Sequence, residues 1–158
     1  MTNAGLNFSD VQTVGSETTT AEILDHYEEG TYVPIWVSTG MTPTYNARAG
    51  GYSKVGRIVC LGGYIWTTAM SGTQTNPCRH GGLPFTALLA HNSGITVSTT
   101  YGSEFTSGRS WWAADVVASG VLISIYSLGD STTNLAVTPA EMNGNPVIIQ
   151  VGGYYAST

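Results

Sequence analysis

Short segments in which apolar and polar side chains alternate with a period of two dominate this chain. The alternation is most regular at Val121, Ile123 and Ile125, and again in residues 147–151. Successive side chains of a strand point to opposite faces, so each segment predicts a strand with one buried face. Similar segments, separated by Gly, Pro, Asn and Ser, predict further strands. The predicted strands cover residues 31–38, 51–70 with a break at Gly56, 82–91, 94–101, 110–118, 120–127 and 145–155.

The order and spacing of these segments predict an all-β domain. About seven or eight strands follow one another roughly every dozen residues, and no helical pattern is long enough to connect parallel strands. This arrangement favours an antiparallel β-sandwich of the jelly-roll kind. The length of 158 residues suits one domain, which we place at residues 21–158.

Glycine and proline mark local features of the predicted strands. Pro34 has no backbone N–H, which places its strand at the edge of a sheet. Residues 40–51, GMTPTYNARAGG, are typical of a break between strands. Gly62 and Gly63 indicate either a β-bulge or a close approach of two backbones.

Two segments have the pattern of a helix start. In residues 19–30 a capping-box spacing precedes a glycine that can end a helix, so one or two helical turns are expected. Before the last strand, Thr138 suits the N-cap, Pro139 the first helical position and Glu141 the reciprocal capping position. A single helical turn is expected there.

Residues 1–20 are polar and follow neither the helical nor the strand period. Their apolar side chains are isolated, so they must be buried against the rest of the domain, a sister chain or a particle. We interpret this stretch as an extended attachment arm that binds another protein. The apolar residues of the arm are Leu6, Phe8, Val11 and Val14.

Charge and composition argue against several partners. Charged residues make up only 9% of the chain, with 10 acidic and 5 basic residues. The basic residues are scattered singly, whereas nucleic-acid binding needs a concentrated basic face. No secretion signal is visible and no apolar run approaches the roughly 20 residues that span a bilayer, so no membrane insertion is expected. Cys60 and Cys78 are too few for a disulfide framework; we expect free thiols, with Cys60 packed in a strand.

The titratable residues do not match a known catalytic or metal-binding pattern. Acidic residues crowd residues 25–29, where solvation or interface charge is the simpler interpretation. Other acids could complete a site in three dimensions, namely Asp10, Glu104, Asp115 and Asp130. His26, His80 and His91 lack the spacing of a zinc site. No GxSxG elbow is present, and no glycine pair precedes a phosphate-binding helix. We therefore expect no enzymatic activity, no cofactor and no metal.

Aromatic side chains give a more specific binding signal. Trp111 and Trp112 are adjacent, so on a strand one enters the core while the other faces solvent or a partner. An exposed indole with polar groups nearby suits stacking against a sugar ring, whose C–H faces are apolar. Packing at a trimer interface explains the same residues equally well. The candidate receptor-binding residues are Tyr101, Trp111, Trp112 and His91.

Four motifs occur in order along the chain: LDHYEEGTYVP, GYSKVGRIVCLGGYI, GLPF and VGGYYAST. Together they resemble a module at the carboxyl ends of bacteriophage tail fibres and related virion proteins, with the pattern LDDYEEGTWTP, GxYTKIGNxVxxxG, GLPF and SGTYxT. His26, Tyr32 and Arg57 depart from that pattern. The matching residues are Leu24, Asp25, Tyr27, Glu28, Glu29, Gly30, Thr31, Pro34, Gly51, Tyr52, Lys54, Gly56, Val59, Gly82, Leu83, Pro84, Phe85, Gly153 and Tyr154.

The resemblance implies a trimeric, mainly β, non-enzymatic virion component. We accordingly expect a homotrimer at the tip of a tail fibre or spike, attached to another virion protein by its arm and contacting a host-surface glycan or protein. Apolar residues on both faces of segment 121–126 agree with a trimer, because one small domain has little interior for them all.

Two other functions stay open at this stage. The same trimer could serve as a capsid decoration or head-fibre protein, so the expected location is the virion surface, on tail or head. The third alternative is a glycan-degrading tailspike enzyme, which would need paired carboxylates about 5 to 10 Å apart in a cleft.

Overall fold

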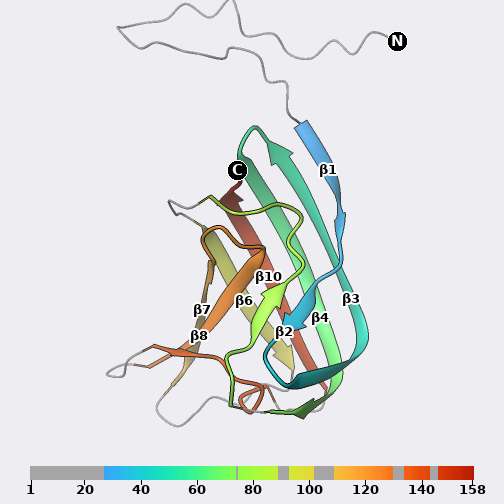
Figure 1. The fold of residues 1–158 in the computed structure, drawn as a ribbon, viewed down its shortest axis with the longest axis vertical. Coiled ribbons are helices and arrows are strands. Elements are labelled where there is room, and N and C mark those ends of the chain that lie inside the picture. The colour runs from blue at the N-terminus through green and yellow to red at the C-terminus, as the bar shows by residue number, and fades with distance from the viewer. Residues whose placement is uncertain (1–26, 74, 89–92, 102–108, 130–133, 143–145) are drawn as a thin grey trace, which may run out of the picture.

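The computed structural model describes residues 27–73, 75–88, 93–101, 109–129, 134–142 and 146–158. These residues form an all-β fold (Figure 1). Its strands are β1 (Tyr27–Tyr32), β2 (Ile35–Val37), β3 (Met41–Val55), β4 (Ile58–Gly72), β5 (Arg79–Gly81), β6 (Gly94–Tyr101), β7 (Trp111–Val116), β8 (Leu122–Leu128), β9 (Leu135–Ala136) and β10 (Val147–Ala156).

The ten strands belong to one antiparallel sheet that curls around a core. The order is β1-β3-β4-β10-β6-β7-β8-β5-β2, with β9 paired to β8. Figure 1 shows β7 and β8 across the molecule from β1 and β3. The all-β, antiparallel class predicted from the sequence is confirmed, whereas the jelly-roll sandwich stays a prediction.

The longest hairpin joins β3 and β4, which have 15 residues each. They meet at a two-residue loop between Val55 and Ile58. Gly56 has a φ of 56° in this loop, which suits the first position of a type II′ turn. The predicted break at Gly56 is therefore confirmed. The break predicted at residues 40–51 is wrong, because β3 runs through them and pairs with β4, with irregular register near Tyr45.

One continuous segment reaches both edges of the sheet. β1 pairs with β3 at one edge, and β2, which follows it in the chain, pairs with β5 at the other. Pro34 lies between β1 and β2, outside any ladder, as its missing N–H requires. The backbone N–H of Trp36 on β2 donates a 2.8 Å hydrogen bond to Tyr45 Oη on β3. This contact brings the two ends of the curled sheet together.

The core fills the inside of the curl. Ile65, Ile149 and Ile123 are fully buried on β4, β10 and β8. The alternation predicted for residues 147–151 is confirmed, because every second side chain there is buried. Val121 is 40% exposed, since it precedes β8 and does not share the buried face predicted for it.

Both predictions of helical turns are wrong within the described residues. Residues 27–30 form the first part of β1, because they pair with residues 52–55 of β3; residues 19–26 lie outside the described part of the chain. Residues 138–142 form hydrogen-bonded turns and no helix. The expected capping contact still forms there, since the backbone N–H of Thr138 donates to Glu141 Oε2 at 3.0 Å.

The strand predicted at residues 82–91 is wrong for residues 82–88, and residues 89–91 lie outside the described part of the chain. Gly82 has a φ of 84°, outside the extended region, and the Val33 carbonyl oxygen lies 2.5 Å from the position where a Cβ would stand. The chain therefore bends here, and a single bridge at Ala87 remains. The strand predicted at residues 31–38 divides into the end of β1 and β2. The strand predicted at residues 94–101 is confirmed as β6, and those at 110–118, 120–127 and 145–155 are confirmed with shifted ends as β7, β8 and β10.

Candidate binding surfaces

The aromatic residues predicted to bind a receptor separate in the structure. Trp111 is 54% exposed, whereas Trp112 packs against the core, so the pair faces opposite sides of β7. Tyr101 ends β6, and its side chain, like the whole of His91, lies outside the described part of the chain. Leu24, Asp25 and the arm residues also lie outside it. Trp111 thus retains the accessibility that a stacking role needs.

A polar row crosses three neighbouring strands on the outward face that carries Trp111. Ser124 of β8 pairs with Asp115 of β7 on one side and with Arg79 of β5 on the other. Directly paired residues point to the same face of a sheet. Neighbouring strands lie about 4.8 Å apart, so the Arg79 and Asp115 backbones are about 10 Å apart. The three residues therefore present a cation, a hydroxyl and a carboxylate in line.

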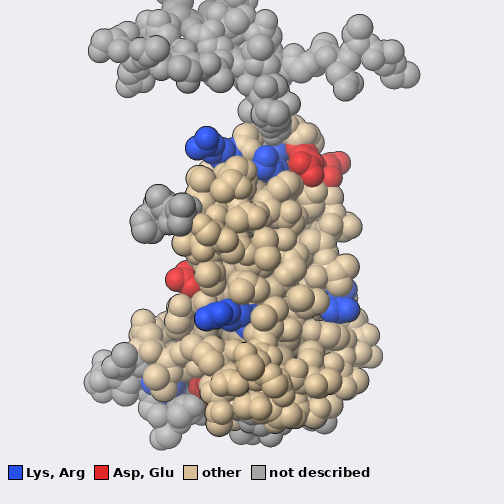
Figure 2. Space-filling view, in the orientation of Figure 1, with Lys and Arg blue, Asp and Glu red and all other residues tan. Residues whose placement is uncertain are grey.

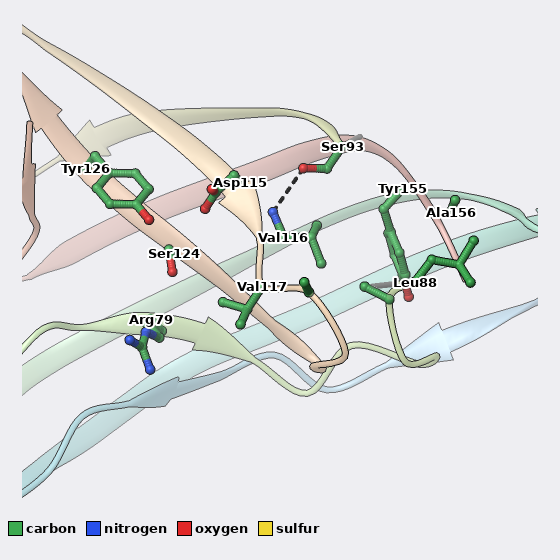
Figure 3. A pocket seen from close by; sticks show the side chains of 12 residues that line it. Arg79, Leu88, Ser93, Asp115, Val116, Val117, Ser124, Tyr126, Tyr155 and Ala156 are labelled. Atoms are coloured by element: carbon green, nitrogen blue, oxygen red, sulfur yellow. Dashed lines mark hydrogen bonds between the residues drawn. The ribbon is translucent and has the colours of Figure 1, made fainter. Parts of the chain in front are cut away.

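These residues line a groove of about 580 Å³, whose wall also includes Ala87, Leu88, Ser93 and Tyr126. Figure 3 shows Ser124 between Arg79 and Asp115, with Tyr126 near the same end of the groove. The Ser93 hydroxyl accepts a 2.9 Å hydrogen bond from the backbone N–H of Val116 and so fixes part of the wall. We call this feature the polar groove.

A second surface lies on the outward face of β3, β4 and β10. Gly62 of β4 pairs with Gly51 of β3 and with Gly152 of β10, so three glycines form one row across the sheet. Two shallow depressions of about 590 and 430 Å³ meet at Gly51 and Gly62. We call this face, with its neighbouring side chains, the glycine face.

Exposed apolar side chains surround the glycine row. Strand periodicity places all of them on the same outward face as Gly62. They are Tyr27 at 61% exposure, Tyr154 at 50%, Ile58 at 47%, Val55 at 40% and Tyr64 at 36%. Contiguous exposed apolar surface of this kind marks an interaction site more often than free surface.

Side chains from each of the four sequence motifs meet in one cluster. Tyr52 of the second motif donates a 2.7 Å hydrogen bond to Glu28 Oε1 of the first. The Tyr52 ring packs edge-on against Phe85 of GLPF at 5.2 Å, and Lys54 Nζ lies 5.1 Å from the centre of the same ring. The Tyr155 hydroxyl donates to the Phe85 carbonyl at 2.9 Å. This motif cluster connects β1, β3, β10 and the bend after β5.

Charged side chains gather at the end of the molecule where β1 begins (Figure 2). Glu28 of β1 lies directly opposite Lys54 in the register of the β1–β3 ladder, and Arg57 follows in the β3–β4 hairpin loop. Glu28 and Glu29 are consecutive in a strand and point to opposite faces. The expectation that the acidic residues crowd one helical turn is therefore wrong for these two.

The described carboxylates show no paired arrangement in a cleft. Glu141 is buried and accepts hydrogen bonds from Ser127 Oγ at 2.9 Å and from Thr138 N. Asp115 lies on β7, and Glu29 accepts a hydrogen bond from Tyr27 on β1. In the described ranges, no group of three or more His, Cys, Asp and Glu side chains is placed to hold a metal ion. The absence of enzymatic activity stays a prediction.

Both cysteines are free, as expected, but their environments differ. Cys78 is 1% exposed, and burial raises the pKa of its thiol to about 12. Cys60 is exposed on β4, so the expectation that it packs inside is wrong. Its side chain lies on the glycine face, directly opposite Tyr154.

His80 is the buried histidine of the described core. It is fully buried on β5, with its ring 6.2 Å from that of Tyr32 in an edge-on arrangement. Burial lowers the pKa of His80 to about 4, so the side chain is neutral at physiological pH. The side chain is therefore enclosed in the core as a neutral ring and is not accessible to a ligand.

Across the described residues, no helix has the length and apolar character needed to span a bilayer.

Comparison with known proteins gives one likeness of fold. No model of a known protein family matches this chain, and no curated protein matches it. The fold is similar to part of the Dettilon tailspike protein (gp208), with a TM-score of 0.70 over 84% of this chain. The aligned residues are 12% identical, so the likeness establishes a shared fold. The chain spans 24% of the length of that tailspike protein.

Proposed function

We propose that this chain is a structural, non-enzymatic module of a bacteriophage virion, which forms a homotrimer at the tip of a tail fibre or spike and contacts the host surface. The fold shared with part of a tailspike protein supports this proposal. So do the four ordered motifs, which resemble the carboxyl-terminal module of phage fibres and which meet in one cluster. The arm would attach the module to another virion protein.

The glycine row is the main observation that supports the proposed self-assembly. Among the described residues, a Cβ at Gly62 would meet nothing within 4 Å, and at Gly51 and Gly152 the nearest atoms would be 3.8 and 3.9 Å away. The fold of the protomer therefore does not require glycine at these positions. Glycine inside a strand costs roughly 0.5–1 kcal/mol relative to alanine. Close approach of a neighbouring chain supplies a reason for three glycines in one row.

A sister chain is the neighbour that best fits the glycine face. The exposed apolar side chains around the row need cover, and the flat row lets another backbone or ring approach closely. A rotation axis beside this face would bring the same face of each copy toward the others.

Sedimentation velocity of the full chain tests the assembly. We expect a species with three times the protomer mass at micromolar concentration. A monomer over the whole concentration range would contradict the homotrimer, and a dimer would contradict its stoichiometry.

Antibody labelling and electron microscopy of intact particles test the location. We expect label at the tip of the tail apparatus. Label on the head surface would instead support a capsid decoration or head-fibre protein. Incubation of the pure chain with host polysaccharide tests the third alternative, since shortening of the polysaccharide would identify a glycan-degrading enzyme.

A further inference from the structure

We infer that the polar groove and Trp111 together bind a neutral oligosaccharide, with the indole stacking on one sugar ring and the row Arg79, Ser124 and Asp115 binding the hydroxyls of another. This inference rests on the proposed host contact, which it deepens by naming the ligand class and the residues.

The two ends of the site share one face of the sheet. Trp111 and Asp115 are four positions apart on β7 and point to the same side. A strand rises about 3.4 Å per residue, so their backbones are about 14 Å apart. Ala113 lies between them and pairs with Tyr126 of β8. The small Ala113 side chain leaves space for a ligand in the middle of this face, beside the Tyr126 ring. This length suits a chain of several sugars better than a single sugar.

The polar end selects a ligand without net charge. Arg79 supplies N–H donors only and Asp115 supplies acceptors only, whereas the Ser124 hydroxyl between them can do both. A phosphate or carboxylate attracted by Arg79 would meet Asp115, and a cation attracted by Asp115 would meet Arg79. Sugar hydroxyls both donate and accept, so one sugar can satisfy the carboxylate and the guanidinium together.

The aromatic end supplies the apolar contact that such a ligand needs. Trp111 is 54% exposed on a strand, so its ring system is available on the same face as the polar row. The C–H face of a sugar ring is apolar and packs against an indole, while its edge carries the hydroxyls. A ligand that uses both ends must therefore be apolar on one face and rich in hydroxyls at its edge.

The polar groove and the glycine face can act at the same time. The polar row and Trp111 lie on β5, β7 and β8, and the glycine row lies on β3, β4 and β10; the groove reaches the end of β10 at Tyr155 and Ala156. Figure 1 shows β7 and β8 on the opposite side of the molecule from β3 and β4. Burying Arg79 and Asp115 in a subunit interface would require their desolvation, which is costly without ideal partners. The groove therefore suits a ligand, and the glycine face suits a sister chain.

A printed array of neutral, anionic and cationic oligosaccharides of different lengths tests the ligand class, with the labelled full chain as the probe. We expect the strongest binding among neutral oligosaccharides. Fluorescence titration with the best neutral oligosaccharide should then give a saturable change in tryptophan emission. An array without any binding, or one in which anionic sugars bind best, would overturn the inference.

Substitutions then assign the binding to this face. Trp111→Ala and Asp115→Asn should each weaken the affinity about tenfold, because each removes one principal contact. Arg79→Gln should have a similar effect. The matched control is Arg57→Gln, the same substitution at an exposed arginine in the β3–β4 loop, which should leave the affinity unchanged. Unchanged binding by the variants at Trp111, Asp115 and Arg79 would overturn the assignment.

Failure of this inference can be told apart from failure of the proposed function. If the chain sediments as a trimer and lies at the tail tip but binds no oligosaccharide, the proposed function stands and only the ligand assignment is contradicted. If the chain is monomeric but binds the oligosaccharide through Trp111 and Asp115, the binding site stands and the proposed trimer is contradicted.

Discussion

At the scale of single residues, the Tyr155 hydroxyl connects two motifs that are 70 positions apart in the sequence. It donates to the Phe85 carbonyl at 2.9 Å and accepts from the Phe85 N–H at 3.3 Å. Tyr155 is 1% exposed, and burial raises the pKa of its hydroxyl to about 12. This contact gives a physical reason for the joint occurrence of GLPF and the closing GGYY.

We expect Tyr155→Phe to lower the free energy of unfolding by about 1–3 kcal/mol, because it leaves both backbone groups of Phe85 without their partner. Urea denaturation followed by circular dichroism measures the change. Tyr52→Phe is the matched control: its hydroxyl bonds Glu28 in an exposed position, so the loss should stay below about 0.5 kcal/mol. Equal losses in the two variants would contradict this account of the motif cluster.

His80 predicts a pH dependence of stability. Its pKa is about 4 in the folded protein, below the 6.5 of an unfolded histidine. Between these values the unfolded chain binds the proton and the folded chain does not, so the stability present above pH 6.5 falls as the pH falls toward 4. The shift corresponds to a loss of about 3 kcal/mol.

Urea denaturation at several pH values and one protein concentration measures this slope. His80→Phe keeps a ring at the position but cannot titrate, so we expect a clearly shallower slope for the variant over the same range. The histidines and carboxylates elsewhere are common to both proteins and cancel in the comparison. Parallel slopes would show that His80 does not carry the effect.

Single residues also show what the sequence can predict of the binding surfaces. The opposite orientations of Trp111 and Trp112 follow from strand periodicity alone and are confirmed. Arg79 and Asp115 were not identified as partners, because no spacing relates them. They meet only through Ser124, which lies on the strand between them. The pairing of β5, β7 and β8 is long-range information that a local pattern does not contain.

At the scale of elements, alternation predicts the strands that bury one regular face. β6, β8 and β10 lie close to their predicted positions for this reason. β3 was missed at residues 41–51 because glycine, proline and asparagine there resemble a break; its pairing with β4 overrides the local preference. The prediction at residues 82–85 has the opposite error, because their apolar character predicts a strand whereas Gly82 requires a bend.

The adjacent glycines of β4 give a test of the glycine face. We expect Gly63→Ala to destabilise the protomer by about 1–3 kcal/mol, because a Cβ there would stand 2.6 Å from Tyr32 Oη and 3.1 Å from the Ala49 carbonyl oxygen. The Cβ added by Gly62→Ala would meet no described residue within 4 Å, so this substitution should leave the protomer as stable or slightly more stable. Thermal unfolding at a concentration where the chain is monomeric measures both.

Substitutions at Gly62 and Gly63 also separate the folding of the protomer from the assembly of the trimer. Gly62→Val should weaken self-association while the protomer stays folded, since the added side chain stands out of the flat row. Unchanged association would show that no chain approaches this row. A Gly62→Ala protomer as unstable as Gly63→Ala would show that the glycine serves the fold of one chain instead.

At the scale of the whole molecule, the curled sheet gives one domain two outward faces of different chemistry. One is flat, apolar and centred on the glycine row, and the other carries an exposed indole and a polar groove. Alternation predicts that a strand has an outward face, but not which outward faces become neighbours. That depends on the strand order, in which β10 joins β4 to β6 although it comes last in the chain.

The cysteines report directly on whether the glycine face is covered. Cys60 lies on that face and Cys78 lies in the core with its pKa raised to about 12, so they should react very differently with a thiol reagent. In a dilute, monomeric sample we expect one rapidly reacting thiol per chain. At concentrations where the chain is trimeric we expect this reaction to slow in proportion to the trimer fraction, because the sister chain covers Cys60.

Cys60→Ser identifies the reacting thiol, since the variant should lose the rapid phase and keep the slow one that appears on unfolding. Gly62→Val should restore rapid reaction at all concentrations, because it disfavours the trimer without exposing Cys78. A trimer whose Cys60 reacts as fast as in the monomer would place the subunit contact elsewhere on the molecule. The glycine row would then need a different explanation, because none of the described residues approaches Gly62 closely enough to exclude a side chain.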